Sequence, residues 1–504
     1  MSRKNLTRNA ASALLQVLAT GAVTFELYRF LNRHLTVAQI GIWSVVLASA
    51  ATGRLIDLGL GGGVVKFVAK YMGAGSRAQA GTTIQMAFAG MAVLFGLVSL
   101  LLYPLLRSGL ALLIKDLSSL EEARVLLPYA LCTLILGALS GVTLSAIDGC
   151  QRMDLRAIVS VTGSFVQLGC AYFLVPQLGL LGLAIGQVIQ SMVVLGVGLM
   201  LLLRLVGPDL YMLTRWRKST FFELIRYGSG FQAAAFGQIL FEPAVKAILT
   251  RYSGLEFTGY YEMANRMILQ LRNVLVSAYQ SLVPYVASAS KSKQEIRSIY
   301  FSSYQFLFFI LALCVGLAGL LLPFVIQFWL GRFVPRFLEI GELSLLGWAL
   351  NTLNVPAYFI FLGTGELRWP VISHTVIGIL AAGFGMLFGH FYGGFGVLGA
   401  VTVALVFGSH IVTYAFHRLN HIPLTWLLPP ESRLTAFCAV LGSVIVLSLE
   451  LFTRNETHIP TIVVIPVLAV TLIYLSLKNP NMKVLMKLIG ELRGSRNDGA
   501  VNPS

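Results

Sequence analysis

Long apolar stretches recur along the whole chain and are separated by short polar segments. A helix needs about 20 apolar residues to cross a bilayer core, and roughly fourteen stretches meet that length. They cover residues 12–32, 39–60, 82–105, 125–147, 157–176, 181–203, 226–249, 257–285, 301–328, 337–362, 370–390, 396–416, 433–452 and 459–477. With 57% apolar and 12% charged residues, the 504-residue chain has too little polar surface for a soluble protein. The pattern therefore predicts an all-α polytopic membrane protein.

Basic residues alternate between the two sides of this predicted bundle. Of the 37 lysines and arginines, 24 lie in one set of alternate connections, including both chain ends, and nine lie in the opposite set. The positive-inside rule then predicts that both termini are cytoplasmic. The net charge of +16 follows from this topology. Because the charges are spread over short loops, we do not expect nucleic-acid binding.

A repeat relates the two halves of the chain. Gly41 and Arg54 in the second span recur as Gly259 and Arg272 in the eighth, each 218 positions later. Two further glycine pairs follow at offsets of 217 and 216, namely Gly179 with Gly396 and Gly149 with Gly365. A unit with an even number of spans, here six, begins and ends on the same side of the membrane. The pattern therefore predicts two copies in the same orientation, which is a parallel repeat about an axis along the membrane normal.

These boundaries predict the domain organisation. We expect an N-terminal lobe of six spans in residues 1–204, a cytoplasmic linker in 205–222 and a C-terminal lobe of six spans in 223–418. Two extra spans then occupy residues 432–478, and a cytoplasmic tail follows in 479–504.

Charged residues inside the spans are expensive in a membrane and so predict function. Four pairs have the spacing of local ion pairs on one helix face: Glu26 with Arg29, Arg54 with Asp57, Glu242 with Lys246, and Glu262 with Arg266. Arg272 has no acidic residue within four positions. The pairs are open to two interpretations, because such pairs either fix helix rotation or line a polar cavity.

The second interpretation gives a candidate substrate site and candidate coupling residues. Arginine binds phosphate oxygens in a bidentate manner, so a slightly cationic cavity suits a phosphate or pyrophosphate head group. The candidates for this surface are Arg54, Lys246, Arg266, Arg272 and Asn265. Asp57, Glu242 and Glu262 are candidates to take up H⁺ or Na⁺ and couple an ion gradient to movement.

Other chemistry is not indicated by the sequence. No Walker motif occurs, and the glycines at positions 59 and 61–63 do not form a nucleotide-binding loop. The five cysteines form no CxxC, and the scattered histidines lack metal-ligand spacing. We therefore expect no metal, no cofactor and no catalytic residues.

Several motifs resemble one known family. The Gly41-Ile-Trp-Ser start of the second span, the Asp57-Leu-Gly-Leu turn and the segment from Ala146 to Arg152 carry the resemblance, with the glycine-rich entry to the sixth span. The chain is similar to the polysaccharide-exporting branch of the multidrug/oligosaccharidyl-lipid/polysaccharide flippase superfamily, and in particular to O-antigen-type flippases. The resemblance covers nearly the whole chain.

This resemblance implies a function, a place and partners. It implies two six-helix lobes around a central cavity, which translocate an undecaprenyl-pyrophosphate-linked oligosaccharide from the cytoplasmic to the outer leaflet of a bacterial plasma (inner) membrane. The implied partners are that lipid-linked oligosaccharide, membrane lipids, the coupling ion, and a polysaccharide polymerase with glycosyltransferases. Export of drugs or organic cations, or of lipid II, is the alternative within the superfamily. A membrane glycan polymerase or ligase is disfavoured, since no external loop exceeds about fifteen residues.

Overall fold

The computed structural model describes residues 3–56, 59–208, 218–280, 282–287, 292–453 and 459–486. All regular structure in these ranges is helical. They contain eight helices that are long and apolar enough to cross a membrane, or ten if each bent pair counts as one span. The predicted class, an all-α polytopic membrane protein, is confirmed, whereas the count of fourteen spans stays a prediction.

The chain divides into two compact units. The first comprises Met1–Ala278 and Leu367–Gly408, and the second comprises Tyr279–Glu366 and Ser409–Ser504. The helices that begin in the first unit are α1 (Arg3–His34), α2 (Val37–Ala51), η1 (Thr52–Ile56), α3 (Leu60–Gly73), α4 (Arg77–Leu113), α5 (Leu117–Gly149), α6 (Met153–Leu178), α7 (Leu180–Val206), α8 (Lys218–Tyr279) and α13 (Arg368–Leu419). Those of the second unit are α9 (Leu282–Ala287), α10 (Lys293–Leu330), α11 (Pro335–Thr352), α12 (Val355–Thr364), η3 (Leu424–Leu427), α14 (Pro430–Thr453) and α15 (Ile459–Lys478). The predicted lobe boundaries stay predictions.

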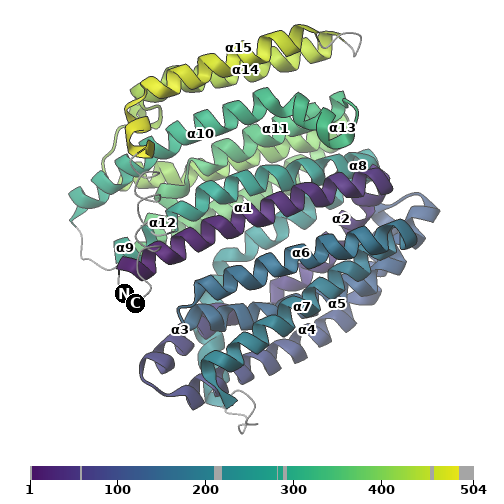
Figure 1. Cartoon of the computed structure of the whole chain (residues 1–504), viewed down its shortest axis with the longest axis vertical. Helices are drawn as coiled ribbons and strands as arrows, with labels where there is room; N and C mark the ends of the chain where they lie inside the picture. The colour runs from purple at the N-terminus through teal and green to yellow at the C-terminus, as the bar shows by residue number, and fades with distance from the viewer. Residues whose placement is uncertain are drawn as a thin grey trace, which may run out of the picture. The chain divides into compact units, whose positions relative to one another are not determined.

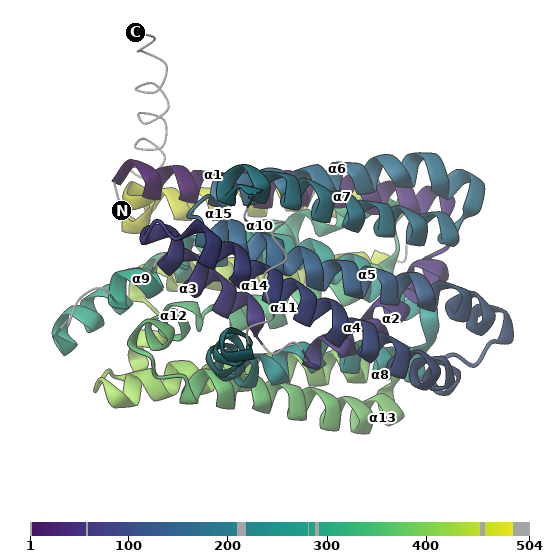
Figure 2. The same ribbon diagram turned by 90° about the horizontal axis from the view of Figure 1, so that it is seen from below.

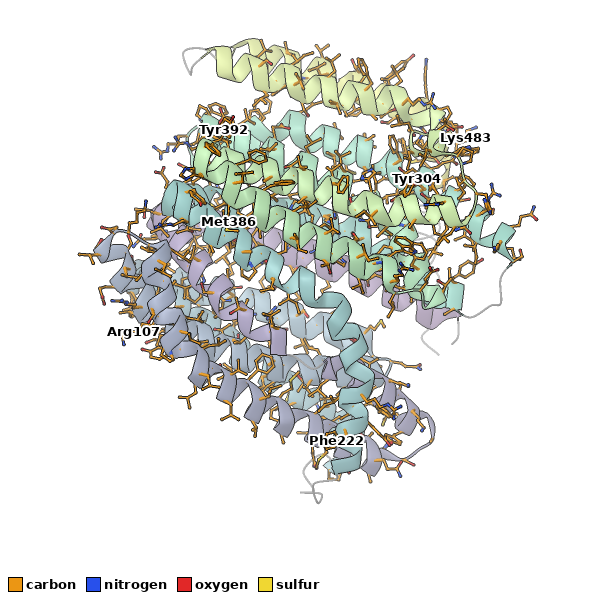
Figure 3. All side chains as sticks on the ribbon, turned by 180° about the vertical axis from the view of Figure 1, so that it is seen from behind. Arg107, Phe222, Tyr304, Met386, Tyr392 and Lys483 are labelled. Carbon is orange, nitrogen blue, oxygen red and sulfur yellow. The ribbon has the colours of Figure 1, made fainter. Side chains whose placement is uncertain are left out.

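Long helices lie side by side in the first unit. Helix α7 packs against α5 and α6, α1 packs along α6, and α4 packs against α5 (Figures 1 and 2). The outward side chains are apolar: Leu100 of α4 is 73% exposed, and Met386 and Tyr392 of α13 project outward in Figure 3. Such a surface suits hydrocarbon rather than water, because burying it in lipid removes apolar area from water.

In the second unit, α10 supports the pair of helices predicted as extra spans. Helices α14 and α15 pack against each other and against α10 (Figure 1). Five buried apolar side chains form their contact: Leu320, Ala439, Val446, Ile465 and Leu472. The hydroxyl of Tyr304, labelled in Figure 3, donates to the Leu427 carbonyl at 3.1 Å and ties α10 to the segment before α14.

Side-chain caps fix where several helices begin. Thr36 and Gln39 form a capping box at the start of α2, because each side chain bonds the other residue's backbone N–H. Ser292 does the same for α10, and Asp116 accepts from the Ser119 N–H at the start of α5. These bonds satisfy N–H groups that lack partners in the first turn.

Two glycines divide the longest helices into pairs of segments. Helix α8 is interrupted at Gly254 (φ 79°, ψ −179°) and α13 at Gly393 (φ 58°, ψ −144°). A side chain would strain both conformations, and glycine has none. Each of these helices therefore provides two helical segments, one on each side of its glycine.

The structure corrects the register of the repeat beyond the second and eighth spans. Gly179, between α6 and α7, has φ 58° and ψ −134°, which matches Gly393 rather than Gly396. A Cβ at Gly182 or at Gly396 would lie 2.4 or 2.2 Å from the carbonyl oxygen eight residues earlier. The offset is therefore 214, and the predicted pairing of Gly179 with Gly396 was wrong by three residues, because the turn conformation fixes the register more strictly than the glycine pattern does.

The same correction applies to the third glycine pair. Gly365 adopts the left-handed conformation (φ 81°), whereas Gly149 is the last residue of α5. The left-handed residue that follows α5 is Gln151 (φ 57°), which again lies 214 positions before Gly365. The predicted pairing of Gly149 with Gly365 was therefore wrong by two residues.

Candidate functional site

Two glutamates, a lysine and an arginine of α8 form one connected charge network in the first unit. The Lys246 Nζ lies 2.6 Å from Glu242 Oε1 and 2.7 Å from Glu262 Oε2. Arg266 Nε donates to Glu262 Oε1 at 2.7 Å, and its Nη2 lies 3.8 Å from Glu242 Oε1. The two predicted i,i+4 ion pairs are confirmed, and the structure joins them into a single cluster.

The break at Gly254 makes this cluster possible. Lys246 and Glu262 each lie eight residues from Gly254, and a straight helix would hold them about 24 Å apart. Because the chain folds back at the glycine, the two residues meet. Thr250 and Thr258, each four residues from Gly254, meet in the same way and share a hydrogen bond of 3.0 Å.

The two glutamates of the network differ in exposure. The Glu262 side chain is 3% exposed, and both of its oxygens are bonded: Tyr28 donates to Oε1 at 3.1 Å and Ser44 donates to Oε2 at 3.0 Å. With two cations and two hydroxyl donors around it, Glu262 is held as a carboxylate. The Glu242 side chain is 41% exposed, and that of Arg266 is 40% exposed. The network therefore has a sealed side at Glu262 and an accessible side at Glu242 and Arg266.

An approximate two-fold axis passes beside this network. A Cβ at Gly41 would lie 2.0 Å from the Leu255 carbonyl oxygen, and one at Gly259 would lie 2.1 Å from the Val37 oxygen. Gly41 with Gly259 and Val37 with Leu255 are both pairs at the repeat offset of 218. Helix α2 and the second segment of α8 thus cross backbone to backbone at equivalent positions, and only glycine permits this approach.

The hydrogen bond between Ser44 and Glu262 belongs to the same relation. These two residues are also 218 positions apart. The repeat read from the sequence therefore has a spatial counterpart: equivalent residues of the second and eighth spans contact each other. Where the first copy carries a serine, the second carries the central carboxylate of the network.

Arg54 lies in a different part of the first unit. It is exposed in η1, directly after α2, and lines a cavity of about 290 Å³. Small and apolar residues form the rest of that wall: Gly61, Met91, Phe95, Leu134, Gly137, Ala138, Gly141, Val142 and Ser145. Asp57, its predicted partner and a predicted coupling acid, lies outside the described residues.

Two of the remaining candidates are buried, and the third is partly buried. Lys246 is 1% and Asn265 2% exposed. Arg272 is partly buried and interacts electrostatically with His374 of α13. Among the five predicted substrate-binding residues, Lys246 and Arg266 are brought together by the structure, and Arg54 belongs to a separate cavity. Binding of substrate by any of them stays a prediction.

Sequence reasoning missed two members of the network. Ser44 had a signal, since it occupies the position equivalent to Glu262 in the repeat. Tyr28 of α1 had none, because nothing in the spacing of α1 indicates which helix faces it. The predicted pair of Glu26 and Arg29 on α1 is present at 3.3 Å, and Tyr172 also donates to Glu26 at 2.9 Å.

The accessible side of the network can bind an anion. Arginine has five N–H donors, and Arg266 gives one to Glu262, which fixes the orientation of the guanidinium. Donors that are not engaged by Glu262, by Tyr28 or by Glu242, whose Oε1 lies 3.8 Å from Nη2, can bind a phosphate oxygen. Beside them, the Glu242 carboxylate contacts Lys246 and is the more exposed acid of the network.

Comparisons with known proteins agree with this arrangement of helices. Residues 6–290 match the model of a family described as "Polysaccharide biosynthesis protein". This match spans more than half of the chain. No curated protein matches the sequence.

Solved structures share the fold at low sequence identity. An inward-facing multidrug resistance MATE family transporter of the MOP superfamily is 14% identical with a TM-score of 0.64, covering 84% of this chain and 95% of that one. A MOP superfamily transporter from Pyrococcus furiosus Vc1 (DSM3638), described by the reverse polarity of its binding pocket, is 14% identical with a TM-score of 0.58, covering 82% and 96%. An outward-facing MATE transporter is 13% identical with a TM-score of 0.57, covering 82% and 96%.

Proposed function

Since the chain belongs to the family of polysaccharide biosynthesis proteins and has the fold of MOP superfamily transporters, we propose that it is a flippase for a lipid-linked oligosaccharide. Its substrate is an oligosaccharide on undecaprenyl pyrophosphate, which it moves from the cytoplasmic to the outer leaflet during synthesis of a cell-surface polysaccharide. It acts in the inner membrane of a bacterium with both termini in the cytoplasm. The polymerase and glycosyltransferases of the same polysaccharide are its partners.

The observation that supports this substrate best is the fixed, half-exposed guanidinium of Arg266. Its Nε is held by the buried Glu262, while 40% of the side chain is exposed. A guanidinium that is already oriented loses little freedom when it binds a phosphate group. Arg272 lies on the same segment of α8, and together with Lys246 the three cations outnumber Glu242 and Glu262. The family match supports a glycan substrate, and this cationic excess suits its pyrophosphate.

We assign the coupling role to Glu242 rather than to Glu262. Glu262 already has four donors, two of them cationic, so a proton or Na⁺ would have to displace them. Glu242 is 41% exposed and has Lys246 as its close partner. Uptake of H⁺ or Na⁺ at Glu242 weakens its attraction for Lys246 and Arg266, which frees Arg266 for the substrate.

Export of a drug or organic cation is the second candidate function. The fold likeness to multidrug resistance transporters favours it, and Glu242 offers an organic cation an accessible carboxylate. Lipid II carries a pyrophosphate, as does the lipid-linked oligosaccharide of the first proposal. The candidates differ in whether the exposed arginine or the exposed glutamate holds the substrate.

Reconstitution into liposomes tests the proposal. The assay follows a fluorescent undecaprenyl-pyrophosphate-linked sugar as it leaves the reach of a quencher that cannot cross the membrane. Arg266→Lys keeps the charge but loses bidentate binding, so we expect translocation to fall by about tenfold or more. Arg272→Ala should act in the same direction. Arg251→Ala is the matched control, because this arginine of α8 is exposed and donates to the Leu112 carbonyl rather than to the charge network.

The outcomes separate the candidates. If Arg266→Lys and Arg272→Ala translocate the lipid-linked sugar as fast as the wild type, these arginines do not bind the pyrophosphate. If liposomes accumulate ethidium in a way that depends on Glu242 and do not move the lipid-linked sugar, organic-cation export is the function.

A further inference from the structure

A second acid, with one buried carboxyl oxygen, lies in the other unit, and the charge network does not use it. Glu342 stands seven residues after the start of α11, about 10 Å along the helix axis and within the apolar stretch formed by α11 and α12. Its Oε1 is buried and has no hydrogen-bond partner. Among the described residues it forms no ion pair, unlike Glu242 and Glu262.

Three helices converge on this carboxyl group. A Cβ added at Gly319 of α10 would lie 2.4 Å from the Ser443 hydroxyl of α14 and 3.3 Å from both carboxyl oxygens of Glu342. Gly319 therefore leaves the space that lets a hydroxyl from α14 and a carboxyl from α11 approach the same point. The absence of a hydrogen bond to Oε1 means that this hydroxyl is near the acid but does not satisfy that oxygen.

Among the described residues, no ion pair joins Glu342 to a cation. Helices α10 and α14 of this unit pack against α11. All charged residues of α10 lie more than twenty residues before Gly319. The basic residue of α14, Arg433, lies ten residues before Ser443. On α11 itself Arg336 and Glu339 precede Glu342 and form no ion pair with it. The titratable groups of these three helices are Lys293, Glu295, Arg297, Tyr300, Tyr304, Cys314, Arg336, Glu339, Glu431, Arg433, Cys438 and Glu450.

These surroundings favour one charge state. A carboxylate in apolar surroundings without a cation is strongly disfavoured, whereas the neutral acid is only a polar group. Glu262 shows what the chain provides when it holds a carboxylate, namely two cations and two hydroxyl donors. Glu342 has none of these, so its surroundings suit a carboxylic acid that carries a proton.

We propose that Glu342 is a proton-binding site between α10, α11 and α14. Hydronium gives its proton to the carboxylate, which yields the neutral acid and water. When the proton leaves again as hydronium, the carboxylate accepts a hydrogen bond from Ser443, which shifts α14 against α11. The step moves one proton and breaks no other bond. The link between this site and substrate movement rests on the proposed flippase function.

Infrared difference spectroscopy of the purified protein tests the site without any substrate. The carboxylic C=O band of the wild type should be present at neutral pH, shift in D₂O and vanish on titration to alkaline pH. Glu342→Gln should lose this band, while Glu339→Gln, three residues away on the same helix, should keep it. Ser443→Ala removes the donor to the ionised form, so in this variant the band should persist to higher pH than in the wild type.

The transport arm uses the fluorescent undecaprenyl-pyrophosphate-linked sugar in liposomes with an imposed pH gradient. We expect the gradient to accelerate Glu342→Gln less than the wild type, because Glu242 can still take up the coupling ion, and we expect the slower exchange without a gradient to be unchanged. Absence of a titrating band that Glu342→Gln removes overturns the proton site, whatever the substrate proves to be. A band that disappears while the gradient response stays as large as in the wild type overturns the coupling of the site to transport. If the wild type moves no lipid-linked sugar, the flippase proposal fails, and the band still decides the proton site.

Discussion

Replacing Lys246 by methionine tests whether the charge network holds the first unit together. Lys246 is 1% exposed and contacts two carboxylates at 2.6 and 2.7 Å. At an effective dielectric constant of about 20, each attraction amounts to about 6 kcal/mol, most of it offset by the desolvation of the ammonium group. Removing one partner of a buried pair leaves the other uncompensated and costs about 3–5 kcal/mol. We therefore expect Lys246→Met to lower the free energy of unfolding by that amount.

Unfolding in mixed micelles of dodecyl maltoside and SDS, followed by tryptophan fluorescence, measures this loss. Arg251→Met is the control, because this exposed side chain makes one hydrogen bond to a carbonyl and should cost about 0.5 kcal/mol or less. If Lys246→Met unfolds at the same SDS fraction as Arg251→Met, the network does not stabilise the unit and the reasoning is wrong.

Three further predictions concern single positions. Gly259→Ala should destabilise by about 1–3 kcal/mol because its Cβ would lie 2.1 Å from a carbonyl oxygen, while Gly399→Ala, with open space around it, should not. Gly393→Ala places a side chain at φ 58° and should cost about 1–3 kcal/mol, whereas Gly383→Ala in the same helix should stabilise slightly. Both pairs are compared by thermal unfolding in detergent. Hydrogen bonds from Ser118 and Ser119 lower the pKa of Asp116 to about 2, so the stability it adds is complete above its unfolded pKa of about 3.9 and is lost as pH falls toward 2. Asp116→Asn should lack that loss when the unfolding midpoint is followed from pH 5 to pH 2, and an identical pH profile would contradict it.

Much of the candidate site follows from spacing alone. The i,i+4 pairs of α8 are fixed by helix geometry, so the sequence predicts that Glu242 meets Lys246 and Glu262 meets Arg266. A turn placed at Gly254 would also predict the contact between Glu242 and Arg266, because each of these residues lies twelve positions from that glycine. Glu342 was not selected from the sequence, because no basic residue lies three or four positions from it. A lone acid inside a span is nonetheless a signal of function.

The sequence by itself determined the membrane class, the repeat at offset 218 and the local ion pairs, because apolar length and helical periodicity are properties of neighbouring residues. The tertiary structure alone decided which face of the network is sealed, since Tyr28 and Ser44 reach Glu262 from α1 and α2. It also decided the offset of 214 in the later spans, which follows from left-handed turn residues rather than from the glycine pattern. It placed an unpaired carboxyl group beside Gly319, where α10, α11 and α14 meet. Contacts between distant segments depend on how helices rotate and cross, and no short-range pattern encodes that.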